Sequence, residues 1–582
     1  MELTAIYHRP ESEYAYLYKE GQVHIRIRTK KEDIEKIVLH YGDPFIFLED
    51  SYEDAKEMVK VTSDALFDYW QVAVSVRFSR IQYLFELDDK EGQSILYGDK
   101  GFTDNSPENL ALEGNRFKLP YIHEIDGCQV PDWVSKTVWY QIFPERFANG
   151  NPNLTPDGAR EWDAAIAPNI DDFFGGDLQG IIDHLDYLKD LGITGLYLCP
   201  IFEATTNHKY DTTDYFEIDR HFGDKEVFRN LVEEAHKRGI KIMLDAVFNH
   251  IGYQSAQWQD VLKNGEQSPY KDWFHIQEFP VTEDKFKNPR ELPYHTFAFA
   301  SYMPKLNTAN PEVRDYLLSV ATYWIEHFDI DAWRLDVANE IDHQFWRDFR
   351  KAVLDKKPDL YILGEIWHTS QPWLNGDEFH AVMNYPLSES IKDYFLRQHK
   401  KIERFLSEIN SQSMCYKQQI SEVMFNLLDS HDTERILTTA QGNIQHVKAA
   451  LTFLYLQKGT PCIYYGTELA LIGGPDPDCR RVMPWDRVSE DNDMLNFMKQ
   501  LIQVRKEVAS TIQHGTYSLE ELKPDVLSLK WNYEGKEVQA IFNQSTENVV
   551  LDRDSVDLAS HCQLEDGQQV ILPDGFVVAV SK

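Results

Sequence analysis

The segment that most constrains the fold is the apolar stretch at residues 330–339, IDAWRLDVAN, which carries one arginine and two aspartates. Apolar residues on both sides of these charges predict a strand buried on both faces, as in an all-parallel sheet. Arg334 and Asp336 are two residues apart, so a strand projects both to the same side. A neighbouring guanidinium favours an ionised carboxylate, as a nucleophile requires, although a structural ion pair at a sheet edge would have the same pattern.

The chain around this segment repeats one order, a strand followed by a helix. Helical periodicity predicts helices at 178–192, 226–239, 311–328 and 342–354, the first two ending at Gly192 and Gly239. Strands are predicted at 138–143, 193–202, 241–248, 330–337, 361–367, 381–385, 424–430 and 461–469. Eight parallel strands that alternate with helices favour a closed (β/α)8 TIM barrel, and an open doubly wound sheet is the alternative.

Patterns of short strands flank this α/β region and predict a multidomain protein. Alternation at 23–28, 72–79 and 81–87 predicts an N-terminal β-sandwich over 1–122, and a linker with Gly127 and Pro131 leads to the barrel at 131–504. Strand patterns at 526–533, 538–544 and 576–581 predict a C-terminal β-sandwich over 505–582. Residues 251–303 are too many for a simple loop and are expected to form an inserted domain after the third strand.

The charge of the chain limits its partners. A length of 582 residues allows several packed domains, and 95 acidic against 59 basic residues give a net charge of −36. Such a surface repels phosphate backbones and anionic lipid, so we expect a neutral substrate and neither nucleic acid nor membrane partners, unless the charge serves solubility alone.

Two further features concern the compartment. The opening MELTAIYHRP has no basic segment leading into an apolar run, and the six cysteines lack metal-ligand spacing. We therefore expect a cytoplasmic protein in a reducing compartment.

Polar side chains gather where four of the predicted strands end. They are Asp245, Asn249 and His250 on the third strand, Arg334 and Asp336 on the fourth, Glu365 and Trp367 on the fifth, and Asp429, His431 and Asp432 on the seventh. All strand C-termini of a parallel barrel share one edge, where barrel enzymes place their active sites. Several carboxylates with aromatic side chains fit glycoside hydrolysis, whereas bunched histidine ligands or a phosphate-binding glycine loop are lacking.

Short motifs in this order resemble those of the α-amylase family of glycoside hydrolases. They are DAVFNH at 245–250, MPKLN at 303–307, DAWRLDVANE at 331–340, GEIW at 364–367 and FNLLDSHD at 425–432, together with VWYQIFPERFANG and HKYDTTDY at 208–215. MPKLN and VANE resemble the branch of cyclomaltodextrinases, maltogenic amylases and neopullulanases, whose members carry an extra N-terminal β-domain. The resemblance covers essentially the whole chain.

The resemblance implies roles for three carboxylates. Asp336 would be the nucleophile, Glu365 the acid/base, and Asp432 a third carboxylate that binds sugar hydroxyls. A retaining mechanism would follow, with the carboxyl groups of Asp336 and Glu365 about 5–5.5 Å apart. From the residues themselves we expect Arg334 to keep Asp336 ionised, and apolar surroundings beside Ile366 and Trp367 to raise the pKa of Glu365.

The same resemblance implies the residues that would bind the substrate. His250 and His431 would bind hydroxyls of the reacting sugar, and Tyr210 would stack under it, although histidines and tyrosines at such positions often serve packing. Asp476 and Arg480 would contact more distant sugars, or form a surface ion pair. Glu340 and Trp367 would act on the acceptor side, where water or a sugar takes the intermediate.

A structural calcium ion is a further expectation from the resemblance, and no cofactor is needed for the chemistry. Oxygen ligands at Asn149, Asn151, Asn153, Gly175 and Asp177 would form its cage. Leu154 and Thr155 depart from the family pattern, since acid or amide ligands are expected there. An ordered Asn-rich turn is the alternative.

The sequence thus predicts an enzyme that hydrolyses α-1,4 bonds of cyclodextrins and short maltodextrins, and of pullulan in addition, releasing mainly maltose with some transglycosylation. Two alternatives stay open, a predominantly glucan transferase and a sugar-binding or scaffold relative without catalysis. The N-terminal domain could bind polysaccharide, but pairing of two subunits in a homodimer suits a small substrate better.

Overall fold

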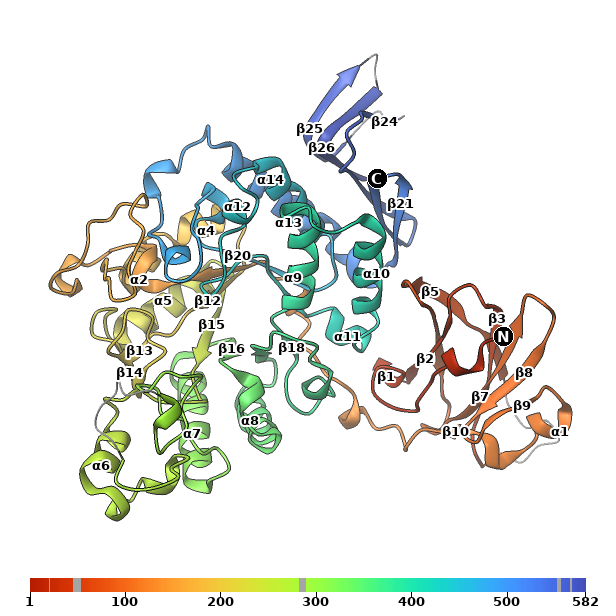
Figure 1. The fold of residues 1–582 in the computed structure, drawn as a ribbon, viewed down its shortest axis with the longest axis horizontal. Helices are drawn as coiled ribbons and strands as arrows, with labels where there is room; N and C mark the ends of the chain where they lie inside the picture. Colours follow the sequence, from red (N-terminus) through yellow and green to blue (C-terminus); the bar gives the residue numbers. More distant parts are fainter. Residues whose placement is uncertain (20, 46–53, 282–288, 552–555, 566–567, 582) are drawn as a thin grey trace.

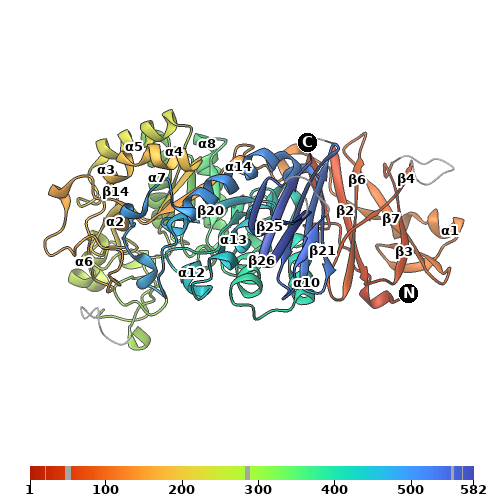
Figure 2. The same cartoon turned by 90° about the horizontal axis from the view of Figure 1, so that it is seen from above.

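The computed structural model describes residues 1–19, 21–45, 54–281, 289–551, 556–565 and 568–581, and it shows three domains (Figure 1). Along the longest axis the barrel lies at one end and the N-terminal domain at the other, with the C-terminal sheet between them (Figure 2). No helix in the described ranges is long and apolar enough to cross a membrane.

The central domain is the predicted barrel. Its eight parallel strands are β11 (Trp139–Ile142), β12 (Gly195–Leu198), β15 (Lys241–Ala246), β16 (Ala332–Leu335), β17 (Tyr361–Gly364), β18 (Ala381–Val382), β19 (Phe425–Asn426) and β20 (Thr460–Tyr464). They pair in the order β18-β17-β16-β15-β12-β11-β20-β19. A parallel bridge between Met383 and Phe425 joins the two ends, so the sheet closes and the open doubly wound alternative is wrong.

Helices follow the strands and cover the outside of the barrel. They are α3 (Leu178–Asp183), α4 (Leu185–Leu191), α5 (Lys225–Lys237), α7 (Pro311–Phe328), α8 (His343–Lys356), α9 (Tyr385–Ile391), α10 (Ile402–Ser413), α11 (Gln418–Ser421), α12 (Ile436–Thr439), α13 (Ile444–Tyr455) and α14 (Asp493–His514). The predicted helix at 178–192 is split at His184, which has a non-helical ψ of 11°. Gly192 ends α4 with a positive φ of 101°, a conformation in which a side chain would be strained.

The segment between β15 and α7 is the predicted excursion, and part of it, 282–288, lies outside the described residues. It contains α6 (Ala256–Asn264) and returns to the barrel through bridges His250–Lys305 and Phe274–Leu306. A hairpin of β13 (Phe202–Ala204) and β14 (Thr212–Ile218) and the short α2 (Pro144–Phe147) complete the loops at this end. These loops surround the C-terminal edge of the barrel.

The N-terminal domain packs two antiparallel sheets on one core. One sheet contains β1 (Ala15–Lys19), β2 (Gln22–Lys30), β5 (Val59–Ser63) and β6 (Phe67–Ser75); the other contains β3 (Ile34–Gly42), β4 (Asp54–Glu57), β7 (Gln82–Asp89), β8 (Ser94–Gly98), β9 (Gly101–Asp104) and β10 (Phe117–Lys118), and α1 (Pro107–Leu110) follows β9. The alternating Val23, Ile25 and Ile27 lie fully buried between the sheets. His24 and Arg26, which alternate with them, are buried too, because this outer face packs against the barrel.

The C-terminal domain is one antiparallel sheet of β21 (Thr516–Lys523), β22 (Val526–Tyr533), β23 (Lys536–Asn543), β24 (Val549–Leu551), β25 (Leu558–Glu565) and β26 (Gln568–Val580). Leu529, Trp531 and Phe542 belong to the same core as the barrel helices, whereas Val526, Ile541 and Ile571 form a small separate core. The helix α14 continues to His514, past the predicted boundary after residue 504, and Gly515 follows it before β21 begins.

Candidate active site

Arg334 is the hub of the charged residues at the C-terminal edge of the barrel. Its Nη1 donates to Asp245 Oδ1 at 2.9 Å and to Asp336 Oδ1 at 2.8 Å, and its Nη2 lies 2.9 Å from Glu365 Oε2. Arg334 is fully buried, and Asp336 and Glu365 are only 5% and 6% exposed. One guanidinium therefore gathers three carboxylates from three neighbouring strands.

The strand register explains this convergence. Asp245 of β15 pairs directly with Arg334 of β16, and Asp336 and Glu365 follow β16 and β17 by one residue. Backbone bonds continue the ladder, since the N–H of Asp336 donates to Ala246 O and that of Glu365 donates to Leu335 O. Parallel pairing in register thus brings residues far apart in the chain to one level of the barrel.

A strained turn after Asp336 shapes the surroundings of Glu365. Val337 has φ 46° and ψ 43°, a left-handed conformation that is costly for a β-branched residue. The turn directs the Val337 N–H to Glu365 Oε2 at 2.9 Å, and the Trp367 indole N–H donates to Glu365 Oε1 at 3.1 Å. The apolar surroundings predicted for Glu365 are wrong, because N–H groups contact both of its carboxylate oxygens.

Burial is the largest influence on the pKa values of Asp336 and Asp245. It raises the pKa of Asp336 well above its usual value; Arg334 opposes the rise, but the charges of Glu365 and Asp245 add to it. Burial likewise raises the pKa of Asp245 to about 6, against the opposing effect of Arg334. Arg334 favours the ionised form of Asp336, as predicted, but burial and the two neighbouring carboxylates oppose it, since three buried carboxylates share one cation.

A chain of hydrogen bonds connects this hub to the loop after β19. Gln141 Nε2 lies 2.7 Å from His431 Nδ1, His431 Nε2 lies 2.6 Å from Tyr210 Oη, and Tyr210 Oη donates to Asp245 Oδ2 at 2.9 Å. Burial lowers the pKa of His431 well below its usual value, so the ring is neutral. With Gln141 as donor to Nδ1, the proton of the neutral ring is on Nε2, which donates to Tyr210.

The third predicted carboxylate lies on the solvent side of this chain. Asp432 Oδ2 is 3.2 Å from His431 Nε2, and Asp432 Oδ1 accepts from Arg480 Nη2 at 3.2 Å. Arg480 also pairs with Asp476 at 2.9 Å. The side chains of Asp432 and Asp476 are 30% and 39% exposed, so both carboxylates are accessible to a ligand at the edge of the barrel.

His250 contacts the backbone of Tyr210, and Lys305 connects Asn249, the neighbour of His250, to Glu340. His250 Nε2 is 3.0 Å from Tyr210 O, and Nδ1 is 3.3 Å from Asn249 Nδ2. Burial lowers the pKa of His250 to about 3, and protein groups contact both ring nitrogens, so a sugar hydroxyl that binds this ring must compete with them. Lys305 donates to Asn249 Oδ1 and lies 3.7 Å from the exposed Glu340 carboxylate.

Trp367 presents an aromatic face beside Glu365. Its ring stacks on Tyr385 with centroids 3.8 Å apart and planes 4° from parallel, and Trp367 is 48% exposed. An exposed, rigidly stacked ring next to a buried carboxylate is a suitable platform for a sugar ring. All eleven residues predicted as catalytic or substrate-binding thus belong to one contact network.

Some members of the network were not among the predicted site residues. Asp245 was noted only as a strand-end residue, yet it contacts Arg334, Tyr210 and Tyr197, whose hydroxyl donates to Asp245 Oδ2 at 2.7 Å. Gln141 and Lys305 were also missed. Both residues lie in motifs that resemble those of the family. Their residue types and spacing did not indicate that they contact His431 and Asn249.

The predicted calcium ligands form a different arrangement. Three backbone N–H groups donate to the Asp177 carboxylate. Gly180 donates to Oδ1, Asn151 donates to Oδ2, and Gly150 is shared between both oxygens. Asp177 caps α3 in this way, and both of its carboxylate oxygens accept hydrogen bonds. Asn149 donates to the Thr155 hydroxyl at 2.8 Å. No cluster of three acid, histidine or cysteine ligands occurs among the described residues. These contacts favour the ordered Asn-rich turn that was the alternative, and calcium binding here stays a prediction.

We expect calcium removal to leave the protein unchanged. Since backbone N–H groups already hold Asp177, excess EGTA should not alter the Tm or the hydrolytic rate. Thermal unfolding scans with EGTA, and with EGTA followed by excess calcium, check this. A Tm that falls with the chelator and recovers with calcium would show that the turn rearranges to bind the ion.

Comparison with known proteins identifies the family. A family model described as "Alpha amylase, catalytic domain" matches residues 141–513, and one described as "Alpha amylase, N-terminal ig-like domain" matches residues 1–123. The chain therefore belongs to the alpha-amylase family of glycoside hydrolases, as the motifs predicted.

Its relatives carry the names of the predicted branch. The chain is 51% identical over 553 residues to an intracellular maltogenic amylase of Bacillus subtilis, with 94% of this chain and 92% of that protein covered. It is 50% identical over 550 residues to a cyclomaltodextrinase of Geobacillus thermopakistaniensis, again covering 94% and 92%. A solved cyclomaltodextrinase structure superposes with a TM-score of 0.91 at 42% identity, over 100% of both chains.

Proposed function

We propose that the chain is a retaining α-glucan hydrolase that cleaves α-1,4 bonds in cyclodextrins and short maltodextrins, releases mainly maltose and also transfers glycosyl groups to sugars. Pullulan is a further substrate under this proposal. One observation carries it, namely that the guanidinium of Arg334 contacts Asp336 and Glu365 at 2.8 and 2.9 Å. Two carboxylates close to one reacting centre are what a retaining mechanism needs.

In the first step, Asp336 attacks the anomeric carbon while Glu365 gives its proton to the glycosidic oxygen. The C–O bond to the leaving sugar breaks, and a covalent glycosyl ester forms on Asp336. In the second step Glu365 takes a proton from an incoming water or sugar hydroxyl, whose oxygen displaces Asp336. Asp432 and His431 would bind hydroxyls of the sugar that reacts, and Tyr210 would stack against it. Asp476 and Arg480 would contact more distant sugars.

The acceptor in the second step decides between hydrolysis and transfer. Trp367 offers a stacking face beside Glu365, and Glu340, next to Lys305, offers an exposed carboxylate to an acceptor hydroxyl. A sugar that stacks on Trp367 would place its hydroxyl near Glu365 in competition with water. These contacts support a measurable transfer activity.

Rates on β-cyclodextrin, pullulan and soluble starch test the proposal. We expect kcat/KM to be highest for β-cyclodextrin, with maltose as the main product. Elongated or isomerised glucans as the main product would favour the transferase, and absence of turnover on all three would favour the sugar-binding alternative. The presence of all three carboxylates argues against the latter, since a non-catalytic relative need not keep them.

The pH dependence of activity follows from the raised pKa of the aspartates. Asp336 must be ionised to attack, so activity is lost as the pH falls through its pKa, which burial raises. We expect the acid limb of the kcat/KM profile to have its midpoint at a pH above about 4, the ordinary pKa of an aspartate. Asp245→Asn removes a negative charge near Asp336, lowers the pKa of Asp336 and should move the limb to lower pH.

Profiles of kcat/KM against pH for the native enzyme and for Asp245→Asn check the direction of this shift. Asp355→Asn, at a side chain 62% exposed on α8, is the matched control and should leave the limb in place. A limb that moves to higher pH in Asp245→Asn would contradict the proposed electrostatic coupling.

We propose that the protein works as a homodimer in the cytoplasm. The N-terminal domain exposes large apolar side chains, including Phe45 at 66%, Phe78 at 41% and Tyr121 at 52%. Arg80 lies over both Phe45 and Phe78, so these rings are neighbours and form a surface suited to a second subunit. Sedimentation velocity should give the mass of a dimer, and a monomer at micromolar concentration would contradict this.

The cytoplasmic assignment has separate support. All six cysteines are free thiols, which suits a reducing compartment. The name of the Bacillus subtilis relative, intracellular maltogenic amylase, is consistent with this location.

A further inference from the structure

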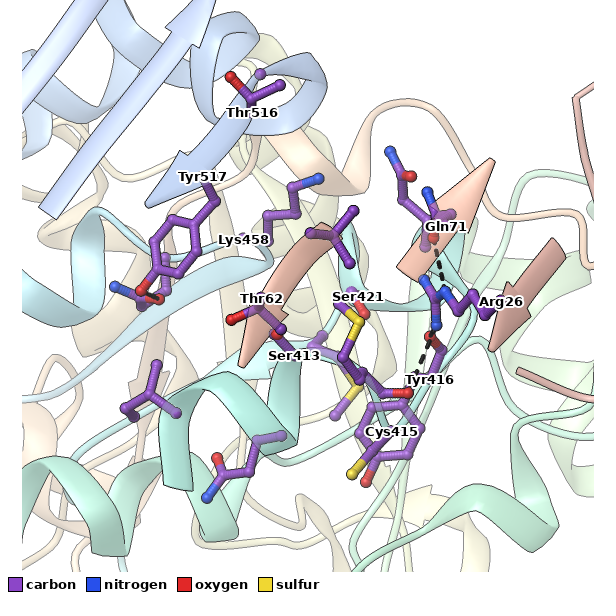
Figure 3. Close-up of a pocket in the computed structure, with 18 of the residues that line it drawn as sticks. Arg26, Thr62, Gln71, Ser413, Cys415, Tyr416, Ser421, Lys458, Thr516 and Tyr517 are labelled. Atoms are coloured by element: carbon purple, nitrogen blue, oxygen red, sulfur yellow. Dashed lines mark hydrogen bonds between the residues drawn. The ribbon is translucent and has the colours of Figure 1, made fainter. Parts of the chain in front are cut away.

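A cavity of about 670 Å³ lies where the three domains meet, and its lining contains none of the residues assigned to the candidate active site. Strands β2, β5 and β6 of the N-terminal domain form one side, the region of α10 and α11 another, and β21 and β22 of the C-terminal sheet the third (Figure 3). The volume falls in the range of about 300–1,000 Å³ that is typical of small-molecule sites.

The charge of this cavity is opposite to that of the protein. Its lining includes four cations, Lys19, Arg26, Lys60 and Lys458, and no aspartate or glutamate among the residues that the structure describes. The chain as a whole has a net charge of −36. A cavity walled by cations in such a protein attracts anions and concentrates them locally.

Asp68 and Glu422 offset part of this charge, since Asp68 pairs with Lys60 and the charge of Glu422 acts on Lys458. Asp68 is 3.6 Å from the Lys60 ammonium, and Glu422 lies behind Tyr18, whose hydroxyl donates to it at 2.8 Å. Lys19 and Lys458 have no carboxylate within ion-pair distance in the described part of the chain. The Lys19 ammonium lies 4.8 Å from the Tyr18 ring centroid.

Two of the cations lie inside the cavity. Arg26 is 6% exposed, and its acceptors in the described part of the chain are neutral, namely Gln71 Oε1 at 2.6 Å, Tyr416 O at 2.7 Å and Met414 O at 3.5 Å. Lys458 is half-buried, and its ammonium lies 5.5 Å from the centroid of the Trp531 ring. Burial lowers the pKa of Lys458, so a bound anion would stabilise its charged form.

Aromatic rings line the same space. Tyr517 and Trp531 have centroids 4.6 Å apart, and Tyr18 stacks on His24 at 4.3 Å. Faces of this kind bind flat or ring-shaped ligands, while lysine and arginine bind phosphate through charge-assisted hydrogen bonds. A neutral glucan would gain little from a wall that offers cations and no carboxylate acceptors.

We propose that this cavity is a binding site for a small phosphate monoester on a ring, a sugar phosphate or a nucleotide. The phosphate would contact Lys458 and Arg26, with Lys60 and Lys19 at the edge, and the ring would pack on Tyr517 and Trp531. Because the walls come from three domains, the ligand stabilises their association and raises the Tm as its concentration rises.

Isothermal titration calorimetry on the full chain tests the site with glucose 6-phosphate, AMP, inorganic phosphate and maltose. We expect glucose 6-phosphate or AMP to bind with a Kd lower than that of inorganic phosphate. The tighter of the two shows whether the ligand is a sugar phosphate or a nucleotide. Lys458→Gln should raise that Kd by roughly tenfold or more, the loss of one charge-assisted hydrogen bond.

Control variants separate this site from the catalytic one. Lys536→Gln, at an exposed lysine at the start of β23, should bind like the native chain, and so should Asp336→Asn. Saturating maltose should leave the binding unchanged. If Lys458→Gln fails to fold, Lys60→Gln, at a side chain 44% exposed, serves instead. Ring-phosphate binding that is absent, displaced by maltose or unchanged in the lysine variant would overturn the proposal.

Discussion

Asp336→Asn is expected to lower kcat on β-cyclodextrin by at least about 10⁴-fold, because the amide cannot form the glycosyl ester. The substitution keeps the shape of a side chain that is 5% exposed and accepts one hydrogen bond from Arg334 at 2.8 Å. It also removes one of three negative charges that share one cation. The Tm should therefore change by only a few degrees. Steady-state rates and thermal unfolding scans on the same preparations measure both quantities.

The matched control for this loss is Asp355→Asn on α8, where the same chemical change affects a side chain 62% exposed. If the control has native activity and Asp336→Asn has a native Tm, the lowered kcat is due to the lost nucleophile and not to unfolding. An Asp336→Asn enzyme that keeps most of its activity would show that another carboxylate is the nucleophile. Mass spectrometry of the native enzyme with a slow substrate should find the covalent glycosyl adduct on Asp336.

Glu365→Gln should give the second largest loss, about 10²–10⁴-fold in kcat on β-cyclodextrin, the usual contribution of a positioned acid. The loss should depend on the leaving group. An aryl glycoside with an acidic phenol releases its phenolate without protonation. Formation of the glycosyl ester from such a substrate therefore needs little help from Glu365. Its burst phase should be nearly native in Glu365→Gln, whereas Asp336→Asn should show none.

The control for this second variant is Glu326→Gln on α7, at a side chain 46% exposed, and it should behave as the native enzyme with both substrates. Equal losses on cyclodextrin and on the aryl glycoside would contradict a proton donor at Glu365. They would instead indicate a positioning role, because Glu365 also holds the Val337 N–H and the Trp367 indole.

Several elements were predictable because local patterns decide them. The strand at 330–337 is apolar on both sides of its charges, and helices such as the one at 311–328 carry their own start and stop residues. Motif order placed Asp336, Glu365 and Asp432 at strand ends, where parallel pairing brings such residues together. Sequence reasoning therefore sufficed for the barrel and for the convergence of the predicted residues, but not for Asp245, Gln141 and Lys305.

Other features depend on contacts between segments far apart in the chain. The role of Asp245 follows from its register with Arg334, and the surroundings of Glu365 follow from the left-handed turn at Val337. Neither has a signature in residue type or spacing. The burial of Arg26 depends on how the N-terminal sheet packs against the barrel.

The sequence by itself determined the (β/α)8 barrel and the residues at its C-terminal edge, because hydrophobic periodicity and strand-end chemistry are local properties of the chain. Only the tertiary structure decided which carboxylates share Arg334, how Asp177 uses its oxygens, and that four cations of two domains line one cavity. The physical reason is that burial and the distance between charges set these properties, and both are defined only after distant segments have packed together.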